Sequence, residues 1–137
     1  MQKPHSGRVC NQKQQIMKVG QQKSAKPKPE TANAITANVI RVINMTPKAV
    51  AYRINNMGVW DAKINAYRLA HTQKGIADVD AIYKGQAIKI EIKSGRDKQS
   101  DHQKAYQQEI ERAGGIYIII RSTDEFLYFW KQIDKRI

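Results

Sequence analysis

The chain has 137 residues, of which 41% are hydrophobic, and this allows one domain with a modest core. Its 24 Lys and Arg against 12 Asp and Glu give a formal net charge of +12, which points to a polyanionic partner. No apolar run approaches the length of a membrane span, and the single cysteine, Cys10, excludes an internal disulfide and a zinc set. We therefore expect a soluble, intracellular protein without a membrane partner.

Residues 1–29 are predicted to form a flexible basic arm. They hold seven Lys or Arg and no acidic residue, and they are rich in Gln, Ser, Gly and Pro. Such an arm would either tether the protein to phosphates by charge alone or serve as a solubilising tail. Residues 30–137 are predicted to form the folded domain.

The first part of this domain is predicted to be a helix over residues 30–45 that ends before Pro47. Its apolar positions share one helical face and are Ile35, Val39, Val42 and Ile43. A first strand is expected over residues 48–55, and an irregular loop over residues 56–74. Within that loop, burial as an anchor is the commoner role for a lone tryptophan such as Trp60, and stacking on a base is the alternative.

The stretch GIADVDAIYKGQAIKIEIK, from Gly75 to Lys93, is predicted to form a β-hairpin. Its strands are residues 76–82 and 87–93, joined by a turn at Lys84-Gly85. Because successive side chains of a strand alternate between faces, one face of the second strand is apolar and the other is charged. The apolar set is Ile88, Ile90 and Ile92, and the charged set is Lys89, Glu91 and Lys93.

The same alternation groups Asp78 with Asp80 on one face, without distinguishing between them. Two close carboxylates repel unless a cation neutralises them, and Mg²⁺ prefers one or two carboxylates while leaving positions for phosphate oxygens. A neighbouring lysine can stabilise a phosphodiester under attack or orient the attacking water. The pattern therefore suits metal-dependent cleavage of nucleic acid, with a solvated hairpin face as the alternative interpretation.

A polar loop follows the hairpin, and a helix is predicted from Ser100 to Ala113. Ser100 and Gln103 stand at the spacing of a capping box. The apolar run at residues 116–120 predicts a strand buried on both faces in the middle of a sheet. A final helix is expected after Ser122. The predicted fold class is α/β, with a mixed four-stranded sheet flanked by helices.

Several of these motifs resemble the core of the PD-(D/E)xK nuclease superfamily. They are G-x-x-D at Gly75 to Asp78, the turn glycine Gly85, and E-I-K at Glu91 to Lys93. The chain is similar in particular to the VRR-NUC branch, the virus-type replication and repair nucleases, and to archaeal-type Holliday-junction resolvases. The segment after Lys93, Gln103 and the glycine-led strand at 114–120 add to the resemblance, which covers roughly residues 30 to 121. Ala77 stands where proline is common in the superfamily.

The resemblance implies a restriction-endonuclease-like core and a site that binds Mg²⁺, for which Mn²⁺ can substitute. It selects Asp78 rather than Asp80. Asp78 and Glu91 would coordinate the metal, together with the main-chain carbonyl of Ile92. Lys93 would position the nucleophile or stabilise the developing charge.

Accessory roles are also implied. Glu30 could add to the metal site, although a helix-start acid favoured by the helix dipole is the alternative. Gln103 could lie near the metal and phosphate, or it could only cap its helix. The expected nucleic-acid-binding residues are Arg53, Lys74, Arg96 and Lys98.

The expected activity is hydrolysis of DNA phosphodiester bonds by a structure-selective endonuclease acting on branched or junction DNA. The resemblance places it in phage or bacterial replication, recombination or repair, hence in the cytoplasm of a bacterial or phage-infected cell, and implies pairing into a homodimer. The alternative is a basic nucleic-acid-binding protein on a nuclease-like fold, without catalysis, whose affinity would depend on salt but not on metal.

Overall fold

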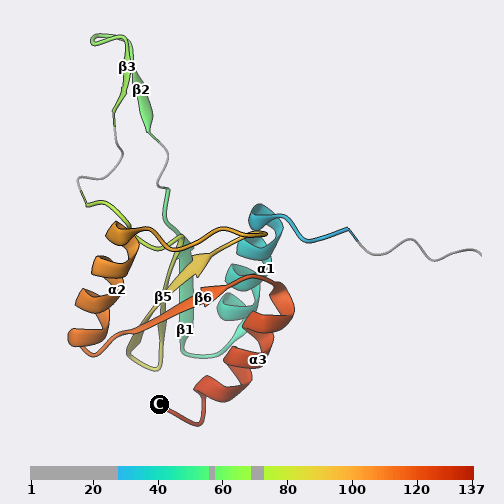
Figure 1. Cartoon of the computed structure of the whole chain (residues 1–137). Coiled ribbons are helices and arrows are strands. Elements are labelled where there is room, and N and C mark those ends of the chain that lie inside the picture. The colour runs from blue at the N-terminus through green and yellow to red at the C-terminus, as the bar shows by residue number, and fades with distance from the viewer. Residues whose placement is uncertain (1–27, 56–57, 69–72) are drawn as a thin grey trace, which may run out of the picture.

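The computed structural model describes residues 28–55, 58–68 and 73–137, so that the predicted arm lies outside the described residues except for its last two (Figure 1). Three helices and six strands follow in this order: α1 (Ala32–Met45), β1 (Ala49–Arg53), β2 (Val59–Asp61), β3 (Ala66–Arg68), β4 (Val79–Tyr83), β5 (Gln86–Ile92), α2 (Asp101–Arg112), β6 (Ile116–Ile120) and α3 (Thr123–Ile133). Within these ranges, no helix combines the length and the apolar character needed to cross a bilayer.

Four strands form one mixed sheet in the order β1-β4-β5-β6. The pairs β1–β4 and β4–β5 are antiparallel, and β5–β6 is parallel. In Figure 1 the sheet lies between α2 on the left and α1 and α3 on the right. The predicted α/β class, with a mixed four-stranded sheet flanked by helices, is confirmed.

The hydrophobic core lies between the sheet and the pair α1 and α3. The predicted apolar faces of the first helix and of β5 both point into it. The core side chains with no solvent exposure are Ile35, Val39, Ile43, Val79, Ile88, Ile90, Phe126 and Ile133. Burial of these side chains holds the sheet against two helices and leaves its other face, toward α2, for polar groups.

The β4–β5 hairpin turns through Lys84 and Gly85, as predicted. Both have positive φ, 50° and 83°, which is the backbone of a two-residue hairpin turn that matches the strand twist. β4 begins at Val79, so Asp78 stands immediately before the strand rather than inside it.

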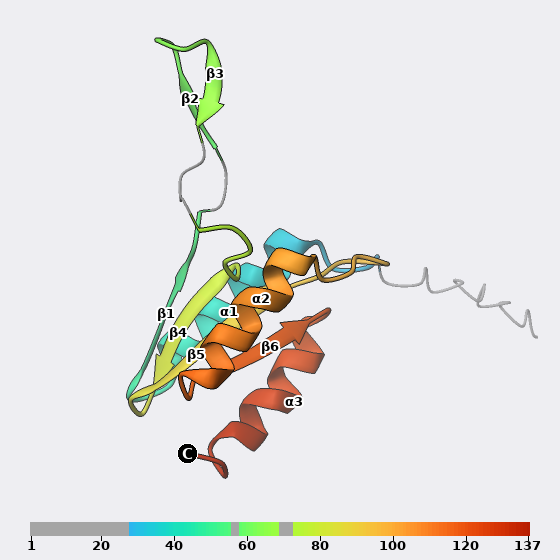
Figure 2. The same cartoon turned by 60° about the vertical axis from the view of Figure 1, so that its left-hand side comes forward.

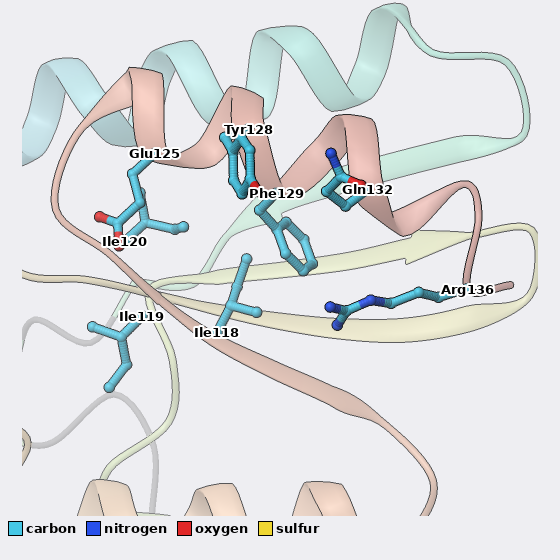
Figure 3. Close-up of a pocket in the computed structure, with 8 residues that line it drawn as sticks. All are labelled: Ile118, Ile119, Ile120, Glu125, Tyr128, Phe129, Gln132 and Arg136. Carbon is cyan, nitrogen blue, oxygen red and sulfur yellow. The ribbon is translucent and has the colours of Figure 1, made fainter.

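The predicted central position of residues 116–120 is wrong. β6 pairs with β5 alone within the described sheet and lies at its edge, and Ile116, Ile118 and Ile119 are only half-buried. The apolar run serves packing between α2 and α3 rather than a second neighbouring strand. A cavity of about 290 Å³ lies between β6 and α3. Figure 3 shows the residues that line it, which are Ile118, Ile119, Ile120, Glu125, Tyr128, Phe129, Gln132 and Arg136.

The predicted irregular loop over residues 56–74 contains a second, two-stranded sheet. β2 and β3 pair in antiparallel register, and the hairpin that they form stands away from the body in both views (Figures 1 and 2). Trp60 is 51% exposed, so its interpretation as a buried anchor is wrong. Three-residue strands are too short to show an alternating pattern, which is why the sequence reads as a loop.

Candidate active site

The predicted site residues gather where β4 begins and β5 ends. The register pairs Val79 with Ile90, so Asp78 comes next to Glu91 at the following position. Asp78 Oδ2 accepts a hydrogen bond of 2.8 Å from the main-chain N–H of Ile92. This bond holds the carboxylate of Asp78 against the end of β5.

Glu91 is the most buried charged side chain among the described residues, with 3% exposure. Its Oε1 forms an ion pair with Lys93 Nζ at 3.0 Å and accepts a hydrogen bond from Gln103 Nε2 at 2.5 Å. Its Oε2 is buried and has no hydrogen-bond partner in the described part of the chain. Burial, followed by the nearby charge of Asp78, raises the pKa of the Glu91 carboxyl, and Lys93 and Gln103 offset only part of this.

Gln103 joins the site to the first turn of α2. Its side-chain Oε1 accepts hydrogen bonds from Lys93 Nζ and from the main-chain N–H of Ser100, both at 2.9 Å. The main-chain N–H of Gln103 donates to Ser100 Oγ. The capping box is therefore complete, and the same side chain contacts Lys93 and Glu91. The capping role is thus confirmed, and the expected position of Gln103 near a metal and a phosphate stays a prediction that its contacts with Glu91 and Lys93 support.

The backbone at Gly75, the first residue of the G-x-x-D motif, requires a glycine. Its φ is 77°, and a Cβ there would lie 2.4–2.7 Å from backbone atoms of His102 and Gln103. Glycine thus permits the chain before Asp78 to touch the first turn of α2. This contact brings Asp78 and Gln103 to the same end of the molecule.

The neighbouring acid, Asp80, has a different partner. Lys89, opposite Asp80 in the register, forms an ion pair with it at 2.5 Å, and the Asp80 side chain is 41% exposed. Asp78, by contrast, raises the pKa of Glu91 by its charge. These contacts separate two residues that strand alternation could not distinguish, and they favour Asp78 as the partner of Glu91.

These residues fit a divalent cation. A buried carboxylate oxygen without a partner costs about 1–3 kcal/mol, and a cation bound by Glu91 Oε2 and Asp78 would remove that cost. No group of three or more His, Cys, Asp or Glu side chains forms within the described ranges. The site implied by the sequence has two carboxylates and the Ile92 carbonyl, which matches the hard-oxygen preference of Mg²⁺.

Glu30 is directed elsewhere. Its Oε2 accepts from the Thr123 N–H at 2.8 Å and its Oε1 accepts from Thr123 Oγ1 at 2.7 Å. The hydrogen bond from the Thr123 backbone is the main cause that lowers the pKa of the Glu30 carboxyl. Glu30 thus stabilises the N-terminus of α3 rather than its own helix, and both of its oxygens are occupied away from Glu91.

The expected nucleic-acid-binding residues are all exposed. Arg53 ends β1 and donates to Asn33 Oδ1 at 2.8 Å, and Lys74 directly precedes Gly75. Arg96 and Lys98 lie on the loop between Lys93 and α2. The structure brings none of the four into contact with the carboxylates.

Sequence reasoning missed two residues near the site. Arg121, at the end of β6, donates to the carbonyls of Gly95 and Asp97 and so fixes the loop that carries Arg96. A first polar residue at the carboxyl end of a parallel strand is a usable signal for such a role.

Tyr117 is the second missed residue. It is 7% exposed, and its hydroxyl has no hydrogen-bond partner among the described residues. Burial first, and the charge of Glu91 second, raise the pKa of Tyr117 to about 12. The lone phenol within the apolar run was its only signal.

No protein-family model matches the chain, and no curated protein matches it either.

Proposed function

We propose that the chain is a metal-dependent endonuclease that hydrolyses DNA phosphodiester bonds, with a restriction-endonuclease-like core of the VRR-NUC type. The observation that supports this best is the buried Glu91 carboxylate in a site shared with Asp78 and Lys93, because its Oε2 has no hydrogen-bond partner among the residues that the structure describes. A solvated hairpin face would not bury an acid in this way. Such a carboxylate is suited to a metal ion that also meets a phosphate.

In this mechanism Asp78, Glu91 and the Ile92 carbonyl would hold Mg²⁺, or Mn²⁺ in its place. The ion, when bound, supplies a water of lowered pKa and polarises the phosphate. The ammonium of Lys93 is held in place by Glu91 and Gln103, and it stabilises the charge that develops as the water oxygen bonds to phosphorus and the P–O bond breaks. The side chain of Gln103 orients both Glu91 and Lys93.

The basic surface supports DNA as the partner. The charge of +12 and the exposed Arg53, Lys74, Arg96 and Lys98 can neutralise phosphates without reading sequence. We propose selectivity for branched or junction DNA, action as a homodimer, and a place in the cytoplasm of a bacterial or phage-infected cell. The competing function is a basic DNA-binding protein without catalysis.

The decisive experiment compares cleavage of labelled four-way junction, flap, linear duplex and single-stranded DNA with Mg²⁺, Mn²⁺ or EDTA. Lys93→Ala should lose at least about 10²-fold in rate, because a charge-stabilising donor is removed. Lys89→Ala is the matched control, since Lys89 lies on the same face of β5 but pairs with Asp80. Binding without cutting by either protein would leave only the DNA-binding function, whereas equal cutting by wild type and Lys93→Ala would exclude Lys93 from the proposed mechanism.

A further inference from the structure

The β2–β3 hairpin, residues 58–68, is connected to the chain at the candidate active site. β1 precedes it and β4 follows it, and the N–H of Ile54 donates to the main-chain carbonyl of Asp78 at 2.8 Å. The segment that leads from β1 into the hairpin therefore begins beside Asp78, which is proposed to bind the metal. In Figure 2 the hairpin extends away from the sheet and from all three helices.

The two faces of this hairpin differ. On one face Trp60 and Tyr67 stand directly opposite each other, with ring centroids 5.1 Å apart and planes at 68°. Their exposed fractions are 51% and 73%. On the other face Asp61 and Arg68 form an ion pair at 2.6 Å, beside the exposed Val59.

The exposed pair of Trp60 and Tyr67 is a candidate binding surface. A two-stranded hairpin is marginally stable in water, and in the described part of the chain β2 and β3 pair only with each other. The edge-to-face contact of Trp60 with Tyr67 contributes about 0.5–1.5 kcal/mol to the hairpin and leaves more than half of each residue's surface exposed. The rings are therefore available to a ligand that offers flat apolar surfaces.

Charge decides between the two candidate partners, a nucleic acid and a second copy of the chain. The hairpin and the residues that flank it carry Arg53, Lys63, Arg68 and Lys74 against Asp61 alone. A second copy brings the same positive charge, whereas a polyanion is attracted. Bases in a duplex are already stacked on one another, so only unpaired bases can stack on Trp60 and Tyr67.

We propose that the Trp60–Tyr67 face of the hairpin binds unpaired nucleotides of the DNA whose phosphodiester lies at Asp78, Glu91 and Lys93. This assignment rests on the proposed function for the position of the phosphodiester. It adds that the substrate has a single-stranded portion next to the bond that is cut.

Intrinsic fluorescence can test the contact directly. The two tryptophans of the chain are Trp60 and Trp130, and Trp130 packs against the core with its indole N–H bonded to Thr46 Oγ1. The Trp130→Phe variant of the full chain leaves Trp60 as the sole tryptophan, so that selective excitation of tryptophan reports on Trp60 alone. Titration with a short oligothymidylate in EDTA, where cleavage is absent, should quench its emission with saturation. A blunt duplex of equal length should quench it much less.

Affinity measurements with single-residue variants supply the controls. Trp60→Ala and Tyr67→Ala should each weaken oligothymidylate binding by roughly five- to hundredfold, the effect of losing one stacked base. Val59→Ala, on the opposite face of the same hairpin, should leave affinity unchanged. Equal affinity in all of these proteins, or no quenching of Trp60, would overturn the proposal.

Sedimentation of wild type and Trp60→Ala measures their oligomeric state and so tests the competing partner, a second copy of the chain. A dimer that Trp60→Ala dissociates, with DNA affinity intact, would make the hairpin a contact between copies and would also overturn the proposal. Failure of the wild type to cut DNA would overturn the proposed function instead, and it would leave the binding result in EDTA standing. The two failures are thus distinguishable.

Discussion

The side-chain amide of Gln103 in α2 donates a hydrogen bond to the buried carboxylate of Glu91 in β5. The carbonyl oxygen of the same amide accepts from Lys93 and from the Ser100 N–H. One side chain therefore completes the start of a helix and positions both the carboxylate proposed to bind metal and the lysine proposed to stabilise the developing charge.

Replacing Gln103 should separate these two roles when it is compared with replacing Ser100. Ser100→Ala and Gln103→Ala should each lower the free energy of unfolding by about 0.5–2 kcal/mol, because each removes part of the capping box. Only Gln103→Ala should also lower the cleavage rate, since it frees Glu91 and Lys93. Urea unfolding and cleavage kinetics give the two values. Equal loss of activity in Ser100→Ala would show that capping alone matters.

Metal binding should depend on Asp78 and not on Asp80. Mg²⁺ should raise the melting temperature of the wild type, by an amount that corresponds to about 2.7 kcal/mol when the ion is at a hundred times its Kd. Asp78→Asn should lose this shift and Asp80→Asn should keep it, because Asp80 pairs with Lys89. Differential scanning fluorimetry with and without Mg²⁺ measures both. A shift that survives Asp78→Asn would remove Asp78 from the site.

Gly75→Ala should destabilise the protein more than Gly85→Ala. Both glycines have positive φ, so both substitutions carry a backbone strain of about 1–2 kcal/mol. A Cβ at Gly75 also meets the backbone of His102 and Gln103, whereas a Cβ at Gly85 has nothing within 4 Å. The extra loss should be about 1–3 kcal/mol in chemical denaturation. Equal losses would mean that strain alone decides.

Asp134 should make stability depend on pH at the acid end. Its carboxylate accepts from Lys84 Nζ and from the Tyr83 hydroxyl, and these bonds, that of Lys84 first, lower its pKa. A lowered pKa means that the contribution is present above the ordinary value of 3.8 and is lost as pH falls below it.

The measurement is urea unfolding of wild type and Asp134→Asn at several pH values. The variant should be less stable than the wild type near neutral pH, and the difference should vanish as the solution is acidified below pH 3.8. A difference that stays constant across this range would show that the carboxylate charge is not responsible.

Elements with local signals were predictable from the sequence. The turn at Lys84-Gly85, the alternation along β5 and the Ser100 cap each depend on neighbouring residues, and each is present. Lateral order in the sheet is not a local property. The apolar run of β6 indicates burial, but it does not indicate which strands lie beside it.

The candidate site also has residues that local sequence signals predict and residues whose roles depend on distant parts of the chain. Asp78, Glu91 and Lys93 lie in one hairpin, so alternation and turn chemistry were enough to group them. Glu30 binds a residue 93 positions away, and no pattern near it indicates that contact. The contribution of Tyr117 depends on the parallel register with β5, which a single sequence does not reveal.

Between Gly75 and Gln103 the chain holds both proposed acids, the lysine and the glutamine that orients them. Such short separations mean low contact order, and loops of this size close at small entropic cost. Helices α1 and α3 supply the buried apolar mass but none of these four groups. Substitutions in those two helices should therefore change the fraction of molecules that are folded, while each folded molecule turns over at its original rate.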